Sequence, residues 1–484
     1  MQSELIFPSG LFSALNNHLF GEGDLEQLAF LLAGVASGRR WLRLLVREVI
    51  PVPAEALERQ TPVSLAVKPA FVQTVLQRCN TEGLSLIEAH SHPFADRQVT
   101  FSSTDLANEA EKFRYLSRKI PSIRHGTLVA GKESLDAHLW DRGRGRAEPF
   151  ERVRVLGSPV RDLLPSSTQP VDVEKLPVEE WLDRQVLALG VEGQRRLEAV
   201  RVGVVGCGGT GSVVVQLLAH LGVRQLVCVD PDWVELTNLN RLVGAVRADV
   251  DRRRFKVQVA RHMVKRINPK SRVIALPLPL KDSRAIASLK GVDMLFGCTD
   301  NHGSRLLLNQ LAVQYLIPYL DLGAGLLAEG GGHLMGGGGQ LRLVLPGEFC
   351  LGCIDGLDRV RAAQDVLPAL SRERQSARGY IVEDDQPTPA ILFLNSLLAS
   401  LAVAEFVNLW TGFRPPVPLL YYDLLGSRLT PARAEQQSSC LVCGEGGSLA
   451  YGDLQCLPIG GENGLPGNIP LSPTLAREVE EMER

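Results

Sequence analysis

The sequence predicts an α/β fold with two domains, and three features of the chain predict it. An apolar run at 202–205 leads through a glycine-rich turn into an amphipathic run at 213–221 and a second apolar run at 226–229. A further apolar run at 292–298 ends in polar residues, as strands do at the ligand-binding edge of a parallel sheet. The length of 484 residues exceeds one ordinary domain. We therefore expect an N-terminal α/β domain and a C-terminal domain with a mostly parallel, doubly wound sheet.

Composition narrows the class of protein. The chain is 45% hydrophobic and 22% charged, as soluble globular proteins are. Its net charge of −2 gives no global basic field for nucleic acid or membrane. No uninterrupted apolar run reaches the roughly eighteen residues of a membrane span, and the N-terminus lacks the pattern of a signal peptide. We expect a cytoplasmic protein that binds neither nucleic acid nor membrane.

Changes in composition along the chain suggest domain boundaries. We expect a first domain at 1–165 and a linker at 166–178, which is rich in polar residues and proline. A second domain follows at 179–450. The Gly- and Pro-rich segment 451–484 predicts a mobile tail.

Apolar runs place some of the secondary structure. In the first domain, runs at 28–32, 42–46 and 84–87 indicate a helix and strands, with an intervening helix at 71–79. In the second domain, the run at 391–409 is apolar on most faces and predicts a core helix.

Two histidines and an aspartate form a candidate metal site in the first domain. His90 and His92 end an apolar run, so alternation along a strand puts both imidazoles on one face. A Ser-x-x-Asp pattern from Ser102 to Asp105 resembles a helix start, which can aim Asp105 at the histidines. Two histidines, one aspartate and a water make a catalytic zinc shell, in which zinc activates the water and polarises a carbonyl. The alternative is a surface turn with solvated histidines and a capping serine.

This pattern resembles the JAMM (MPN/JAB) metalloprotease family, whose members cleave isopeptide or peptide bonds after ubiquitin-like proteins. The resemblance implies that His90, His92 and Asp105 bind zinc and that Ser102 helps to hold the oxyanion. Nine residues separate His92 from Ser102, two more than is usual in the family. A longer loop absorbs this difference, or it marks an altered or lost protease.

The family also uses a glutamate as general base, before an apolar run that ends in glycine. Glu26 precedes such a run, which ends at Gly34. It lies one residue further from the glycine than is common, and Gln27 occupies the usual position. Glu26 is our candidate, and Glu48 and Glu88 rank below it.

The glycine-rich turn of the second domain has the order of a dinucleotide-binding βαβ unit. Gly206 allows the tight turn, and Gly208 and Gly209 let backbone N–H groups approach a phosphate. Gly211 lets the helix pack closely on the sheet, and the helix N-terminus faces an anion. Asp230 ends the second strand, where a carboxylate would accept ribose hydroxyls.

Charged residues follow at the carboxyl ends of the predicted strands. Arg241 and Lys256 supply cations for nucleotide phosphates, and Asp300 is a hard oxygen ligand suited to Mg²⁺. An NAD-dependent dehydrogenase fits these residues less well.

Several motifs agree in order and spacing with the ThiF/MoeB, ubiquitin-activating-enzyme superfamily: Arg-Gln before the strand, Gly-x-Gly-Gly-x-Gly, Asp-x-Asp, Thr-Asn-Leu-x-Arg and Cys-Thr-Asp-Asn. The resemblance covers roughly residues 180–445. It implies a Rossmann-like fold that adenylates the C-terminal glycine of a ubiquitin-like protein with ATP and Mg²⁺. The residues implied in nucleotide and Mg²⁺ binding are Gly206, Gly208, Gly209, Gly211, Asp230, Asp232, Asn238, Arg241, Lys256, Asp300 and Asn301.

The same resemblance implies that Arg184 is an arginine finger that reaches the site of the other subunit of a homodimer. Arg184 as a surface arginine and Asn301 as a helix cap remain open alternatives.

Two Cys-x-x-Cys pairs, Cys350 with Cys353 and Cys440 with Cys443, predict one tetrahedral structural Zn²⁺. Before them, the glycine-rich run 323–339 predicts a loop or a strand with close backbone approach, and we assign no site to it. Between the pairs, the stretch 372–388 matches a crossover loop that can bear a thioester-forming cysteine in the superfamily, but it contains none.

The activated carboxylate could therefore pass to a thiol of a partner, or to a hydroxyl such as Ser376 or Thr388.

The combined interpretation is an adenylyltransferase fused to a JAMM-like metalloprotease, which activates a ubiquitin-like C-terminus and cleaves after it, either to mature a precursor or to reverse conjugation. Bacterial ubiquitin-like conjugation is the expected context, with a ubiquitin-like protein and a conjugating-enzyme-like protein as partners. Two alternatives remain: adenylation of a sulfur-carrier protein, and a scaffold that binds ubiquitin-like folds without cutting them.

Overall fold

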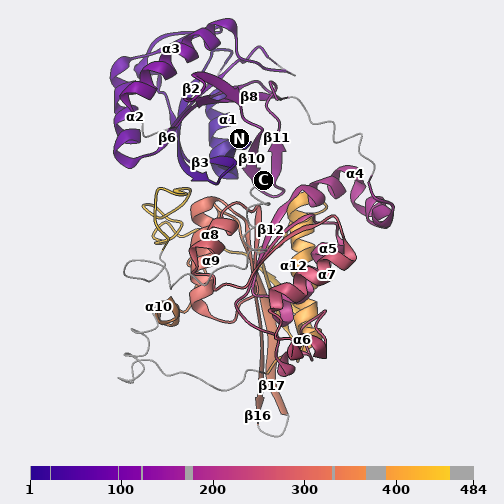
Figure 1. Ribbon diagram of the computed structural model, residues 1–484. Helices are drawn as coiled ribbons and strands as arrows, with labels where there is room; N and C mark the ends of the chain where they lie inside the picture. The colour runs from indigo at the N-terminus through magenta and orange to yellow at the C-terminus, as the bar shows by residue number, and fades with distance from the viewer. Residues whose placement is uncertain are drawn as a thin grey trace. The chain divides into compact units, whose positions relative to one another are not determined.

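The computed structural model describes residues 2–21, 23–95, 98–120, 124–168, 178–329, 333–366 and 389–457. The chain divides into two compact units (Figure 1). The first unit comprises residues 1–177 with the short segments 314–316 and 448–456, and the second comprises the remainder.

The first unit is built on a mixed sheet with the strand order β11-β10-β1-β3-β2-β6-β7-β8-β9. Strands β1, β10 and β3 pair in parallel, as do β6 and β7, whereas β2 runs antiparallel to both of its neighbours. The strands are β1 (Gln2–Pro8), β2 (Leu28–Ser37), β3 (Trp41–Pro51), β6 (Ser85–Ser91), β7 (His125–Ala130), β8 (Leu135–Asp141), β9 (Arg146–Pro149), β10 (Arg152–Leu156) and β11 (Arg161–Leu163), and a separate ribbon joins β4 (Leu57–Thr61) to β5 (Ser64–Val67).

Strand β2 is buried on both faces. Leu31 and Ala33 belong to a core cluster with α1 (Ser9–Phe20), whereas Phe30 and Leu32 belong to a cluster with α2 (Pro69–Glu82). The helix expected among the apolar runs at 28–32, 42–46 and 84–87 is therefore wrong, because all three runs are strands. A strand covered on both faces reads as a continuous apolar run and shows no alternation.

His125, at the start of β7, is buried, and neither ring nitrogen has a hydrogen-bond partner among the described residues. Its ring stacks on Phe113, with the centroids 5.8 Å apart. Burial, and the nearby positive charge of Arg142, lower the pKa of His125 from 6.5 to about 4. Between these two values the unfolded chain binds a proton that the folded chain does not, so stability falls as the pH falls through this window.

Lowering the pH from 7 to 5 should therefore cost the first unit about 2 kcal/mol through His125 alone. Replacement by phenylalanine (His125→Phe) keeps the stacked ring and should remove this part of the pH dependence. Urea unfolding midpoints at the two pH values measure the difference. The exposed His333 offers a control in His333→Gln, which should follow the wild type. An unchanged pH dependence in His125→Phe would contradict the assignment.

The second unit has a sheet in the order β14-β13-β12-β15-β16-β17-β18-β19. The first five strands are parallel and the remaining pairings are antiparallel, so the expected mostly parallel sheet carries an antiparallel extension. The strands are β12 (Arg201–Val205), β13 (Gln225–Val229), β14 (Arg272–Leu276), β15 (Met294–Gly297), β16 (Tyr319–Glu329), β17 (His333–Val344), β18 (Leu419–Asp423) and β19 (Arg428–Ala432).

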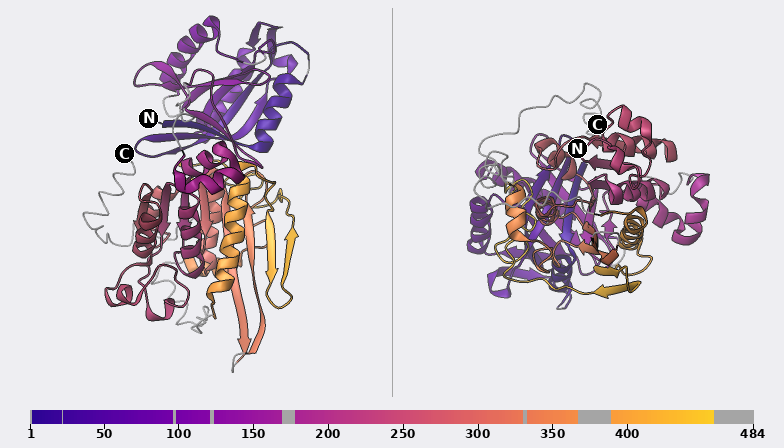
Figure 2. Two further views of the ribbon diagram at one scale, coloured as in Figure 1. Left: turned by 90° about the vertical axis from the view of Figure 1, so that its right-hand side faces the viewer. Right: turned by 90° about the horizontal axis from the view of Figure 1, so that it is seen from below.

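The glycine-rich run 323–339 lies in β16 and β17, which form a long antiparallel hairpin (Figures 1 and 2). We expected either a loop or a strand here, and the described residues of the run form strands. The glycines are needed where the sheet leaves no room: a Cβ at Gly338 would lie 1.9 Å from the carbonyl oxygen of Tyr422, and one at Gly339 would lie 2.1 Å from Leu398.

Helices accompany the parallel strands: α4 (Asp183–Ala199), α5 (Gly209–His220), α6 (Arg247–Asp251), α7 (Lys256–Ile267), α8 (Ser283–Leu289), α9 (His302–Tyr315), α10 (Arg359–Val366) and α12 (Leu392–Thr411). The predicted core helix at 391–409 corresponds to α12, which packs against α5 and α4 (Figure 2). Among the described helices, α12 alone is long and apolar enough to cross a membrane, and over half of that stretch is buried inside the protein.

The segment 448–456 folds with the first unit, although we expected a mobile tail from 451. Gly452 forms a β-bridge with Val35, and Asp453 accepts a hydrogen bond from the backbone N–H of Ser37 at 2.9 Å. The guanidinium of Arg47 lies 3.9 Å from the ring centroid of Tyr451.

Candidate functional site

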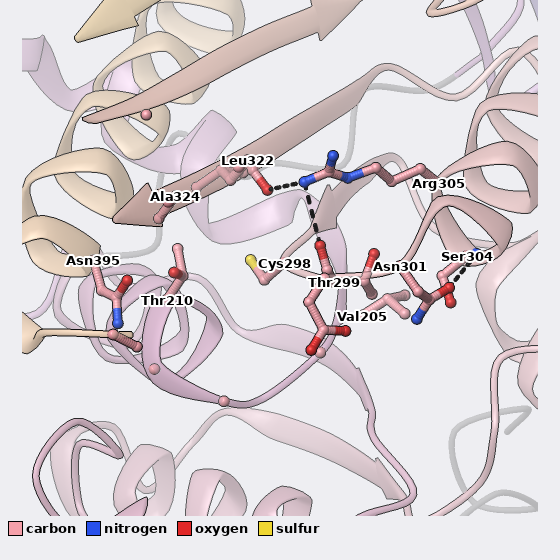
Figure 3. A pocket seen from close by; sticks show the side chains of 18 of the residues that line it. Val205, Thr210, Cys298, Thr299, Asn301, Ser304, Arg305, Leu322, Ala324 and Asn395 are labelled. Atoms are coloured by element: carbon pink, nitrogen blue, oxygen red, sulfur yellow. Dashed lines mark hydrogen bonds between the residues drawn. The ribbon is translucent and has the colours of Figure 1, made fainter. Parts of the chain in front are cut away.

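A cavity of about 1360 Å³ lies in the second unit, where the parallel strands end (Figure 3). Residues from the carboxyl ends of β12, β13 and β15 line it, together with the glycines of the β16–β17 hairpin and the start of α12. This is the edge at which open parallel sheets bind ligands.

The glycine turn shapes one wall of the cavity. Gly206 has a φ of +86°, and a Cβ at Gly211 would lie 1.8 Å from its carbonyl oxygen. A Cβ at Gly209 would lie 2.4 Å from the side-chain nitrogen of Asn395. Gly208 is the N-cap of α5, so the free N–H groups of the first helical turn face the cavity and can bind phosphate.

Asp230 is buried behind the turn and supports it. Its carboxylate accepts hydrogen bonds from the backbone N–H of Cys207 at 2.7 Å and of Asp232 at 2.9 Å. Burial raises the pKa of Asp230, and Lys256 and the two backbone N–H groups oppose that shift. Asp232 lines the cavity as Asp230 does, and its side chain is largely exposed.

Two cations, Lys256 and Arg241, also line the cavity. The amino group of Lys256 lies 2.7 Å from a carboxylate oxygen of Asp232. Burial alone would lower the pKa of Lys256, but Asp230, Asp232 and Asp300 raise it overall, so the side chain is a cation. The guanidinium of Arg241 donates to the carbonyl of Thr237 at 2.8 Å.

Asn238 also lines the cavity. Its side-chain oxygen accepts from the backbone N–H of Glu235 at 3.1 Å, which stabilises the turn before Arg241.

Asp300 and Asn301 follow β15 and line the cavity. Asp300 is exposed, and its carboxylate makes no hydrogen bond or ion pair with the described residues. Asn301 accepts from the backbone N–H of Ser304 at 2.7 Å (Figure 3), so it caps the start of α9, as one of the two expectations had it.

Arg184 lies exposed on α4 and does not belong to the described lining of the cavity. Ser376 and Thr388 lie outside the described residues. Sequence reasoning missed Asn395 and Arg305, which both line the cavity. No local motif marks Asn395, whose place beside Gly209 depends on the packing of α12 on α5.

The four cysteines of the two Cys-x-x-Cys pairs come together in the second unit. All are buried, and their sulfur atoms lie within 4.8 Å of one another. Cys350 and Cys440 are 3.6 Å apart and Cys353 and Cys443 are 3.3 Å apart. Tetrahedral zinc with Zn–S bonds of about 2.3 Å needs sulfurs about 3.8 Å apart, so the donor set fits Zn²⁺.

A second donor cluster lies in the first unit. Nε2 of His92 is 3.4 Å and Nε2 of His90 is 3.8 Å from the same carboxylate oxygen of Asp105. Tetrahedral zinc places such donors about 3.3 Å apart. Among the described residues, Nε2 of His90 is buried without a hydrogen-bond partner, so it is free to bind a metal. Burial would raise the pKa of Asp105, but His90, His92 and Ser102 lower it overall, so the carboxylate is ionised.

Two further residues flank this cluster. Ser102 caps α3 (Ser103–Lys119), accepting from the backbone N–H of Asp105 at 3.1 Å, and the carboxylate of Asp105 accepts in return. This capping box confirms the predicted helix start.

Glu26, just before β2, lies 3.9 Å from Nε2 of His92 and is buried. Burial raises its pKa, and the two histidines oppose the shift. The lower-ranked Glu48 and Glu88 pair instead with Arg78 and Lys112.

The ThiF family matches residues 182–442 of the chain. Over 132 residues, the chain is 42% identical to the probable adenylyltransferase/sulfurtransferase MoeZ of Mycobacterium tuberculosis, covering 27% of this chain and only 33% of MoeZ. It is 29% identical over 268 residues to the SAMP-activating enzyme E1 of Haloferax volcanii, covering 55% of this chain and 88% of that enzyme. E. coli MccB solved with ATP is a structural neighbour at 20% identity and a TM-score of 0.44, covering 55% and 75% of the two chains. The match to the ThiF family covers more than half of the chain, so the protein belongs to that family.

Proposed function

We propose that the second unit uses ATP and Mg²⁺ to adenylate the C-terminal glycine of a ubiquitin-like protein. In this reaction a carboxylate oxygen attacks the α-phosphorus, the bond to the bridging oxygen breaks, and pyrophosphate leaves. Both reactants are anions, so catalysis requires positioning and positive charge.

One observation carries the proposal. A single cavity brings together the α5 N-terminus, the cations Arg241 and Lys256, and Asp300, whose carboxylate is unpaired among the described residues. Backbone N–H groups and the two cations would hold the phosphates, and Asp300 would hold Mg²⁺. The names of the relatives, an adenylyltransferase and an activating enzyme E1, agree with this chemistry.

The proposal extends to the carrier protein that is adenylated and to the acceptor of the activated carboxylate. A ubiquitin-like protein is our first choice and a sulfur-carrier protein the second, since the relatives are a SAMP-activating enzyme and an adenylyltransferase/sulfurtransferase. A homodimer would let Arg184, exposed on α4, reach the site of the other subunit. A conjugating-enzyme-like partner would receive the activated carboxylate.

ATP–pyrophosphate exchange tests the proposal. Full-length protein should exchange labelled pyrophosphate into ATP only when a ubiquitin-like or sulfur-carrier protein with a free C-terminal glycine is present. The same carrier lacking its last glycine is the control. If none of a panel of such carriers supports exchange, adenylation is not the activity. That result would favour the alternative of a scaffold that binds ubiquitin-like folds without cutting them.

We further propose that the first unit is a zinc-dependent protease acting after a ubiquitin-like C-terminus. The supporting observation is that Nε2 of His90, which has no hydrogen-bond partner in the part of the chain that the structure describes, lies beside His92 and Asp105, with Glu26 buried alongside. Zinc would polarise the scissile carbonyl and activate a water. Glu26, 3.9 Å from Nε2 of His92, would take the proton of that water, and Ser102, which caps the helix that carries Asp105, would help to hold the oxyanion.

Replacing Glu26 with glutamine should abolish cleavage while zinc stays bound. The substitution removes a proton acceptor but keeps size and hydrogen bonding, so activity should fall by about 10²-fold or more. Cleavage of a ubiquitin-like protein with a C-terminal extension is the assay, and zinc content by mass spectrometry is the second readout. Glu48→Gln is the control, because Glu48 pairs with Arg78. Full activity in Glu26→Gln would assign the base to another residue.

A further inference from the structure

Arg305 lies on α9 with its guanidinium at the floor of the nucleotide cavity (Figure 3). One terminal nitrogen donates to the carbonyls of Thr299 and Leu322, at 3.4 Å each. Its Nε is buried, and no described residue forms a hydrogen bond with it. A guanidinium group can donate five hydrogen bonds, and Arg305 makes two long ones with the described residues.

The carboxylate beneath Arg305 is already occupied. Asp321 is fully buried and accepts from Arg342 at 2.6 Å and from the hydroxyl of Tyr319 at 2.9 Å. Burial and the charge of Asp321 raise the pKa of Tyr319, so its hydroxyl keeps the proton that it donates. Nε of Arg305 is 3.4 Å from Asp321 without a hydrogen bond between them.

The charges at this floor do not cancel. Within the described part of the chain, Arg305 and Arg342 share one ion-pair partner, Asp321. Two guanidinium groups and one carboxylate leave one positive charge, mostly out of solvent, since the side chain of Arg305 is 12% exposed. A buried surplus charge is costly unless an anion comes to it.

We propose that Arg305 binds the C-terminal carboxylate of the carrier protein and holds it for attack on ATP. This assignment rests on the proposed adenylation and adds a substrate-recognition residue to it.

The position of Arg305 favours a carboxylate over a phosphate of ATP. The phosphates already have the α5 N-terminus, Arg241 and Lys256. Arg305 instead bridges the segment after β15 to β16, where the glycine-lined hairpin leads away from the turn. At Gly325 and Gly336, which also line the cavity, a Cβ would meet open space, so a chain ending in glycine has room to reach Arg305.

Peptide binding to the full-length protein tests the assignment. The probe is a fluorescent peptide ending in Gly-Gly, as the free acid and as the C-terminal amide, with Mg²⁺ and α,β-methylene-ATP present. Wild type should bind the acid about tenfold or more tightly than the amide. Arg305→Met should bring this ratio close to one with little change in affinity for the nucleotide analogue, and Arg305→Lys should keep part of the preference.

Tyr319→Phe is the control, because it removes a hydrogen bond to Asp321 and keeps the charge balance. This variant should still prefer the acid peptide to the amide. That result would show that the preference depends on the charge of Arg305 and not on the packing of the residues around it. An acid preference that survives in Arg305→Met overturns the assignment, and so does a main loss of nucleotide affinity in that variant. A wild type that binds the nucleotide without preferring the acid overturns the assignment but leaves adenylation standing. Failure of wild type to bind the nucleotide overturns both.

Discussion

Replacing Asp300 with alanine should lower carrier-dependent ATP–pyrophosphate exchange by about 10³-fold. Asp300 follows β15 and lines the cavity, and no described side chain or backbone group is paired with its carboxylate. A hard oxygen with open coordination positions is what Mg²⁺ binds. Without Asp300, only Lys256 and Arg241 would neutralise the negative charge that develops on the leaving pyrophosphate, because Mg²⁺ would not be held there.

The control for this variant is Asp423→Ala. Asp423 lines the same cavity from β18, and its carboxylate accepts from the backbone N–H of Leu425. This change should alter exchange by less than about threefold, because the carboxylate supports a turn of the antiparallel strands. Thermal unfolding of Asp300→Ala should match wild type, since Asp300 is exposed. Exchange within tenfold of wild type in Asp300→Ala would show that Mg²⁺ is held elsewhere.

The parts of the site that could be predicted are those whose chemistry is local in sequence. The turn from Gly206 to Gly211 and the two Cys-x-x-Cys pairs each place their functional groups within a few residues. The Ser102–Asp105 capping box is of the same kind. Residues this close in sequence stay close in space however the rest of the chain folds.

The parts that could not be predicted depend on packing between distant segments. The carboxylate of Asp230, which we expected to meet the ribose, also accepts hydrogen bonds from the backbone N–H groups of Cys207 and Asp232, because the glycine turn lies against the end of β13. Asn395 meets Gly209 because α12 packs on α5. Arg305 matters through the charge balance of Asp321 and Arg342, which a single sequence does not reveal.

The same limit applies to the first unit. The apolar run at 28–32 is a strand whose two faces are covered by α1 and α2. The sequence around the run does not show that these two helices pack against it, so the run could be taken for a helix. Glu26 precedes that strand, and β2 pairs with β6, which carries His90 and His92. The pairing register, with Leu28 opposite His90, brings Glu26 to the histidines.

Replacing Cys440 with serine should remove one zinc ion per chain and lower the melting temperature of the second unit by about 10 °C or more. The cysteine sulfurs are buried and close together, an arrangement that is unfavourable without a metal. They join segments 90 residues apart, from Cys350 to Cys440. Loss of one ligand therefore frees the C-terminal segment of the unit as well as the metal.

The exposed Cys456 provides the control for this experiment, because Cys456→Ser changes a cysteine outside the cluster. It should keep the zinc content and melting temperature of wild type. Counting zinc in Cys440→Ser beside His90→Ala separates the two metal sites: each variant should lose one ion, and only Cys440→Ser should destabilise the second unit. If Cys440→Ser kept its full zinc content, the four cysteines would not be a zinc site, and their burial would then reflect packing alone.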